Sequence, residues 1–262
     1  MIKALFSKRF LLTTLLVPLA VGVMIRLGIW QLDRLEERRE YNHQVITMRQ
    51  ADPLELEGED VAVPDPAITP EDLTSWEYRT AVVEGGYDHD HALVIRNQAW
   101  ENQAGVHVLT PLILEGSSEA VLVDRGWLPL ESYQDGTWRE YRESARRVRG
   151  LIRLPQNTAP WGGQSNPVPR SDEFIEAWHF IDLEAIETGL PYPLQPVYLQ
   201  ALPAGEAQAL PYRQQPEFDL SQGPHLGYAI QWFAFAAALG LGYPIFVYRR
   251  HEARSEDLSL PL

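Results

Sequence analysis

A histidine at the start of a long apolar segment is the side chain in this sequence best suited to bind a ligand. His225 is followed by Tyr228 and Trp232 at spacings of three and seven residues, which places all three on one face of a helix. Imidazole is a standard axial ligand of haem iron, and the flat rings of tyrosine and tryptophan suit a planar macrocycle. Aromatic side chains also gather where helices leave a membrane, so these residues alone leave open an interfacial belt or a haem site.

Other arrangements that could support chemistry are weak. The sequence has no G-x-S-x-G motif and no glycine-rich phosphate loop. The run Asp88-His89-Asp90-His91 suggests a metal site, but neighbouring residues in a strand point to opposite faces, which favours a solvated hairpin tip. His107 lies in an apolar stretch and is predicted to be a core histidine with a hydrogen-bond partner. We therefore expect a protein that is not an enzyme.

The composition excludes further classes of protein. The 262 residues include 36 acidic and 22 basic ones and no cysteine, for a net charge of -14. Without cysteine the chain forms no disulfide, binds no iron–sulfur cluster and has no thiol nucleophile. Thiolate copper carriage is excluded as well, and three methionines are few for a thioether copper site. The excess of acid repels phosphates, so we expect no nucleic-acid partner.

Two segments predict helices that cross a lipid bilayer. Phe10 to Trp30 spans 21 residues with Arg26 as its one charge, and as a helix it would be about 31 Å long at ~1.5 Å per residue. Leu226 to Tyr248 has 23 residues and no charge, a pattern that soluble proteins rarely contain. A cleaved signal peptide is the alternative for the first segment, but no A-x-A-like site follows its apolar core.

Basic residues flank the pair of apolar segments. Lys3, Lys8 and Arg9 precede the first, and Arg249, Arg250 and Arg254 follow the second. Positive charge favours the cytoplasmic side, which predicts that both termini are cytoplasmic and that the main domain is extracytoplasmic. Three arginines just after the first segment, accompanied by acids, favour the reverse orientation. The short start without a serine- and arginine-rich leader predicts a bacterial plasma-membrane protein that crosses twice.

The predicted organisation has five parts. They are a cytoplasmic N-terminus (1–9), transmembrane helix 1 (10–32), an extracytoplasmic domain (33–224), transmembrane helix 2 (225–248) and a cytoplasmic tail (249–262). Residues 27–50 contain no proline and repeat with helical spacing, so the first helix is expected to continue beyond its apolar part.

Patterning within the central domain predicts an α+β fold built on antiparallel strands. Strands are expected at 78–83, 92–97, 106–114, 120–127, 148–154, 178–181 and 197–202, with a short helix at 182–188. Turns are expected at Gly85-Gly86 and 116–118, a partly helical stretch at 131–147, and a proline-rich loop between 52 and 72.

Six short motifs follow one another along the chain. They are Gly28-x-Trp30-Gln31-x-x-Arg34-x-x-x-Arg38, Tyr78-Arg79 with Tyr87-Asp88, Gly105-x-x-Val108-x-Thr110-Pro111, the run VLVDRGWLP at 121–129, Gly150-x-x-Arg153, and His225-x-x-Tyr228-Ala229-x-Gln231-Trp232-Phe233. In this order they resemble the signatures of the surfeit-locus-1 family of cytochrome oxidase assembly proteins. Asp124 stands where that family usually has asparagine, and Arg38 stands where it has lysine.

The resemblance implies an integral membrane assembly factor for aa3-type cytochrome c oxidase that assists haem a insertion into the catalytic subunit. The implied partners are that subunit, haem a synthase and the lipid bilayer. The implied haem site has His225 as axial iron ligand and further contacts from Tyr228, Trp232, Trp30, Gln31 and Arg34. Arg34 would pair with a haem propionate or anchor the helix at the interface. A haem-independent scaffold that stabilises an oxidase assembly intermediate is the alternative function.

Overall fold

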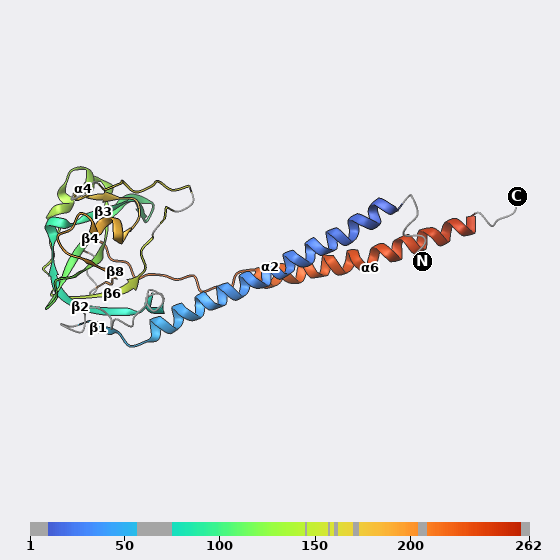
Figure 1. The fold of residues 1–262 in the computed structure, drawn as a ribbon, viewed down its shortest axis with the longest axis horizontal. Helices are drawn as coiled ribbons and strands as arrows, with labels where there is room; N and C mark the ends of the chain where they lie inside the picture. Colours follow the sequence, from blue (N-terminus) through green and yellow to red (C-terminus); the bar gives the residue numbers. More distant parts are fainter. Residues whose placement is uncertain are drawn as a thin grey trace. The chain divides into compact units, whose positions relative to one another are not determined.

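The computed structural model describes residues 10–56, 75–144, 146–156, 158–159, 162–169, 173–203 and 209–257. The chain divides into two compact units, one made of Met1–His43 with Asp219–Leu262 and the other of Gln44–Phe218. The first is helical and the second is rich in strands (Figure 1). The predicted α+β class, with an apolar helix before and after a strand-rich domain, is confirmed. The basic N-terminal residues and most of the predicted proline-rich loop lie outside the described residues.

Two long helices, α2 (Leu11–Gln50) and α6 (His225–Asp257), carry the apolar segments. Both are long and apolar enough to cross a membrane. Helix α2 continues through its charged second half, as predicted, because residues 31–50 contain neither proline nor glycine. Helix α6 begins at His225, the residue predicted to open the second span.

The two long helices run side by side in opposite directions in the helical unit (Figure 1). A Cβ added to Gly28 would lie 2.7 Å from the Phe233 ring, so glycine permits the contact between α2 and α6. Further along the pair, the Val21 side chain lies 3.7 Å from the position that a Cβ on Gly240 would take. Small residues of this kind let helices approach closely where lipid offers no hydrophobic driving force.

In the described residues of the strand-rich unit, eight strands form a sheet. Its strands are β1 (Leu54–Leu56), β2 (Thr80–Tyr87), β3 (Leu93–Trp100), β4 (Gln103–Leu114), β5 (Ala120–Pro129), β6 (Arg147–Arg153), β7 (Ala177–Trp178) and β8 (Leu194–Ala201). Short helices α4 (Leu130–Gln134), α5 (Leu183–Glu187), η2 (His89–His91) and η3 (Thr137–Glu140) lie in the connections. Antiparallel ladders dominate, and β1–β2, β3–β7 and β5–β8 are parallel pairs.

Five of these strands close into a barrel. The sheet order is β1-β2-β6-β8-β5-β4-β3-β7, and β2 also pairs with β4, which completes a ring of β2, β6, β8, β5 and β4. With β5 and β8 parallel and the other ring pairs antiparallel, this is the connectivity of the OB-fold, a five-stranded Greek-key barrel. Its interior holds a buried apolar cluster that includes Val83, Leu112, Val123 and Leu199. The fold alone assigns no function.

The predicted turn at Gly85-Gly86 is wrong, because both glycines lie inside β2. There β2 leaves its pairing with β6 and joins β4. A Cβ on Gly85 would lie 2.2 Å from the Ile113 carbonyl oxygen, so glycine allows the close strand crossing that closes the barrel. The predicted hairpin tip at 88–91 is wrong as well, since η2 connects strands that do not pair with each other. The predicted loop at 52–72 is wrong for Leu54–Leu56, which form strand β1.

The packing of α2 on α6 gives a first prediction. Replacing Gly28 by leucine should force the helices apart and destabilise their pairing by about 1 to 3 kcal/mol, the usual cost of overpacking. Because the chain has no cysteine, the pairing can be measured as disulfide yield in a Val21→Cys/Gly240→Cys background. The matched control is Gly22→Leu, since nothing lies within 4 Å of a Cβ at Gly22. Equal disulfide yields in the two leucine variants would contradict the prediction.

Candidate functional site

His225 is held by a side chain from the other long helix. Its Nδ1 lies 2.8 Å from Oε1 of Gln31. Because an amide oxygen only accepts hydrogen bonds, Nδ1 donates in this contact, and Nε2 is the nitrogen that carries the lone pair when the ring is neutral. Histidines that bind metals through one nitrogen usually donate the other N–H in this way, which fixes the tautomer and the ring plane.

Gly223 leaves space beside the second nitrogen of His225. A Cβ on Gly223 would lie 3.3 Å from Nε2 and 3.2 Å from Cδ2, and the residue has a positive φ of 66°. Both the backbone conformation and the short distance favour glycine at this position. The hydrogen bond at Nδ1 is therefore compatible with iron binding at Nε2, and glycine at 223 avoids placing a side chain against the same edge of the ring.

The predicted aromatic contacts differ in how open they are. Tyr228 is 49% exposed and Trp30 is 45% exposed, so both rings are available to an incoming group. Trp232 is half-buried and packs edge-on against Phe235, with ring centroids 6.3 Å apart. In the helical unit, the rings of Tyr228 and Trp30 are therefore exposed, whereas the ring of Trp232 is partly covered by Phe235.

The two arginines of the first motif have different partners. Arg34 pairs with Glu37 on its own helix at 2.5 Å and is half-exposed. A propionate would therefore have to compete with Glu37 for this guanidinium. Arg38 instead donates to the backbone oxygens of Asp219 at 2.5 Å and Ser221 at 3.1 Å. Arg38 thus holds the segment that leads into α6, a role that its position in the motif did not predict.

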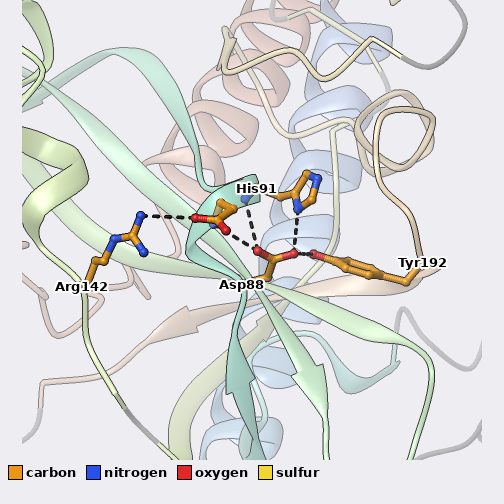
Figure 2. Close-up of polar contacts among 5 residues, drawn as sticks. Asp88, His91, Arg142 and Tyr192 are labelled. Carbon is orange, nitrogen blue, oxygen red and sulfur yellow. Dashed lines mark hydrogen bonds and ion pairs between the residues drawn. The ribbon is translucent and has the colours of Figure 1, made fainter.

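The acidic and histidine run at 88–91 forms a structural cluster. Asp88 caps η2 by accepting from the backbone N–H groups of Asp90 and His91. Its other oxygen accepts from His91 Nδ1 and from the Tyr192 hydroxyl, both at 2.7 Å (Figure 2). The carboxylate of Asp90 instead pairs with Arg142, at 3.3 Å. Among the described residues, no group of three or more histidines and acids could hold a metal ion.

Charge and hydrogen bonds set the pKa values in this cluster. Burial alone would raise the pKa of Asp88, but the hydrogen bonds from Tyr192 and His91 outweigh it, so that pKa is lowered. Burial and the neighbouring Asp88 together raise the pKa of Tyr192. The cluster therefore joins the β2–β3 connection to the α5–β8 connection through an ionised carboxylate.

His107 forms a second pair of this kind. Its Nδ1 lies 2.8 Å and 3.0 Å from the two carboxylate oxygens of Asp124, so the predicted hydrogen-bond partner is confirmed. Burial tends to lower the pKa of His107, but the charge and hydrogen bond of Asp124 raise it above its usual value. Asp124, which departs from the family pattern, is therefore matched by a histidine on the neighbouring strand.

The motif Arg125-Gly126-Trp127 binds the segment that follows the barrel. The backbone N–H of Trp127 donates to the backbone carbonyl oxygen of Tyr212 at 2.9 Å, and the backbone N–H of Tyr212 donates to the carbonyl oxygen of Trp127 at 2.8 Å. Gly126 has a φ of 126°, and a Cβ there would lie 2.5 Å from the Tyr212 oxygen. Arg213 donates to the Arg125 carbonyl at 3.2 Å. This close contact gives Gly126 a structural role, because a side chain there would push the segment around Tyr212 away from β5.

These features define a class of protein in which a barrel domain is preceded and followed in the sequence by a helix that is apolar and long enough to cross a membrane. Residues 19–237 match the sequence profile of the SURF1 family, and the chain belongs to that family. It is 27% identical to Surfeit locus protein 1 of Takifugu rubripes over 89% of this chain and 93% of that protein. It is 26% identical to the human Surfeit locus protein 1 over 81% of this chain and 70% of that protein.

A second prediction concerns the cluster in Figure 2. Asp88→Asn removes the charge that accepts from Tyr192 and His91, and should lower the free energy of unfolding by about 1 to 2 kcal/mol at pH 7. Because the pKa of Asp88 is lowered in the fold, its stabilisation is present above about pH 4 and is lost as the pH falls through the folded value. Urea midpoints of wild type and variant should therefore converge in acid.

The control for that measurement is Asp90→Asn. Asp90 is the exposed neighbour whose carboxylate pairs with Arg142. Exposed ion pairs contribute little, so this change should cost less than about 1 kcal/mol. Equal losses in the two variants, or a difference between wild type and Asp88→Asn that persists below pH 3, would show that the cluster does not stabilise the fold electrostatically.

A third prediction follows from the His107 pair. Because the pKa of His107 is raised, its pairing with Asp124 contributes stability that is full below about pH 6.5 and is lost as the pH rises through the folded value. Asp124→Asn should remove this dependence and lower the pKa of His107 in an NMR titration. Glu115→Gln, a neutralising change at an exposed turn, should leave both quantities unchanged. An unaltered His107 titration in Asp124→Asn would contradict the assignment.

Proposed function

We propose that this protein is an integral membrane assembly factor for aa3-type cytochrome c oxidase that assists haem a insertion into the catalytic subunit, and that it is not an enzyme. The observation that supports this most directly is the hydrogen bond between Gln31 and Nδ1 of His225, which leaves Nε2 of the histidine available to bind a metal. Membership of the SURF1 family is consistent with the proposal. The proposed partners are the catalytic subunit, haem a synthase and the surrounding lipid bilayer.

Different side chains of the helical unit would bind different parts of haem a. Haem a supplies a planar macrocycle, an iron that accepts a nitrogen ligand, and carboxylate side groups. His225 would provide that nitrogen, and Gln31 would orient the imidazole ring by accepting from Nδ1. The exposed rings of Tyr228 and Trp30 offer flat apolar contacts. Arg34 can bind a carboxylate when it releases Glu37.

The proposed location is a bacterial plasma membrane, crossed by α2 and α6. Both helices have the length and composition for this. The basic residues outside the two apolar segments support cytoplasmic termini and an extracytoplasmic barrel domain. In this orientation His225, at the first turn of α6, belongs to the outer end of its span. Cofactor transfer at that level needs no catalytic group in the protein, only a ligand that can release the iron.

The fourth prediction tests the haem site. Full-length protein co-expressed with haem a synthesis should purify with a Soret absorption band, and His225→Ala should lose or shift it. Gln31→Leu should retain the ligand but lose its orientation, lowering haem affinity by about 10- to 100-fold, the usual effect of removing such a partner. His43→Ala, at an exposed histidine on α2, is the matched control and should keep the band.

The same preparations separate the carrier from the scaffold. A haem-independent scaffold would remain colourless and would retain oxidase subunits in pull-down experiments whether or not His225 is present. A colourless wild-type protein under these conditions would therefore refute haem delivery, and loss of subunit capture only in His225→Ala would support it. The scaffold function is kept as the alternative outcome of this experiment.

A further inference from the structure

The strand-rich unit contains a cleft that the proposed haem site does not use. It has a volume of about 1210 Å³ and is bounded by the β3–β4 turn, the segment 140–143, the end of β8 and the segment 209–217. All of its lining residues are in the described part of the chain. The cleft therefore belongs to the barrel domain alone and does not involve His225.

A buried arginine forms part of the cleft wall. The side chain of Arg125 is 2% exposed, and its Nη2 donates to the Tyr141 carbonyl at 2.6 Å. Its buried Nε has no hydrogen-bond partner in the structure, and the nearest carboxylate oxygen, on Glu143, lies 3.8 Å away. Burial lowers the pKa of Arg125, as expected for a cation that is incompletely compensated.

A second arginine shares the same carboxylate. Arg213 donates through Nη2 to Glu143, and its Nε binds the Arg125 backbone. Two guanidinium groups therefore face one carboxylate, which leaves one positive charge in excess. Guanidinium groups bind carboxylates and phosphates because their N–H donors match pairs of oxygen atoms, and here the bound group is a carboxylate. Arg125 and Arg213 therefore form a carboxylate-binding site, which Glu143 of the same chain occupies.

Glu143 is placed so that another carboxylate could take its position. It lies in the irregular stretch 141–144, outside every strand and helix, and its side chain is 36% exposed. Its main chain is held separately, because its carbonyl oxygen accepts from His89 Nε2 at 2.9 Å. Rotation of the side chain would release the arginines without breaking a strand ladder.

The walls of the cleft indicate what would carry the incoming carboxylate. Trp100 and Tyr212 present rings whose centroids are 4.3 Å apart, and Gln214 and Gln215 add amides that both donate and accept. Flat rings and amide groups suit an extended polypeptide, which offers apolar side chains and a main chain to bind. The lining also holds exposed acids at Glu101, Glu140 and Glu217, which repel a ligand rich in negative charge.

We propose that this cleft binds an extended segment of a partner protein through one carboxylate, which displaces Glu143 from Arg125 and Arg213. The carboxylate belongs to an acidic side chain or a C-terminus, and the residues around it are neutral or basic to match the acids of the lining. Glu143 acts as an internal competitor that keeps the arginines paired when no partner is bound.

The experiment uses full-length protein in detergent micelles and fluorescein-labelled heptapeptide pools. One amidated pool has a central glutamate with glycine, proline, glutamine or lysine at the flanks. A second has a central glutamine, and a third ends in a free carboxylate. Fluorescence polarisation should show binding of the glutamate pool or the free-carboxylate pool, which identifies the source of the carboxylate, and none of the glutamine pool.

Opposite effects of two neutralising substitutions distinguish binding from a purely structural ion pair. Glu143→Gln removes the competitor and should tighten peptide binding by about tenfold, whereas Arg213→Gln removes a donor and should weaken it by at least about tenfold. Arg139→Gln breaks an exposed ion pair with Glu176 outside the cleft and should leave affinity unchanged. Thermal midpoints measured on the same samples show that each variant is folded.

Several results would overturn the proposal. They are the absence of binding to wild type and to Glu143→Gln, equal binding of the glutamate and glutamine pools, or changes of the same sign in Glu143→Gln and Arg213→Gln. Competition by succinate as effective as that by peptide would show a site for small carboxylates and would refute the polypeptide. Each of these outcomes is independent of the Soret band, so the haem function can fail or stand separately.

Discussion

The register between α2 and α6 is the constraint on which the helical unit depends. Because Gly28 lacks a Cβ, the Phe233 ring can occupy the position that a side chain would fill. A slip of one helical turn, about 5.4 Å, would remove this contact and would also separate Gln31 from His225. The packing and the hydrogen bond therefore specify the same register. Interhelical hydrogen bonds of this kind contribute only about 1 kcal/mol, so the glycine contact is needed to make the arrangement unique.

The barrel depends on a similar relation between glycine and close approach. Gly85 allows β2 to change partners and close the ring, and Gly126 allows the segment around Tyr212 to pair with β5. In both places a carbonyl oxygen lies within 2.5 Å of the position that a Cβ would take. Closure pairs the end of β2 with the end of β4, so the backbone groups there are not open to pairing with other chains. In both places the glycine permits two backbone segments to approach closely, and it does not form a turn.

Local patterns in the sequence were sufficient for most strands and for α5, whose N-cap is Asp182 and whose end is followed by Gly189. They failed where the conformation depends on distant partners. Gly85-Gly86 has the composition of a turn, and only the approach of β4 shows that it is part of a strand. The β3–β4 turn uses Glu101 and Asn102 at positive φ, without the glycine that usually marks such turns.

The candidate sites, like the fold, could be predicted only where local spacing determines them. Helical spacing placed His225, Tyr228 and Trp232 on one face, but the partner of His225 is 194 residues away in the sequence. No local pattern connects Asp88 with Tyr192, or Arg125 with Arg213. The last two links each use a charged group that would be costly to leave unpaired, and they join segments that are far apart in the sequence. Polar pairs therefore determine how the connections lie on the barrel, whereas the apolar cluster determines that a barrel forms.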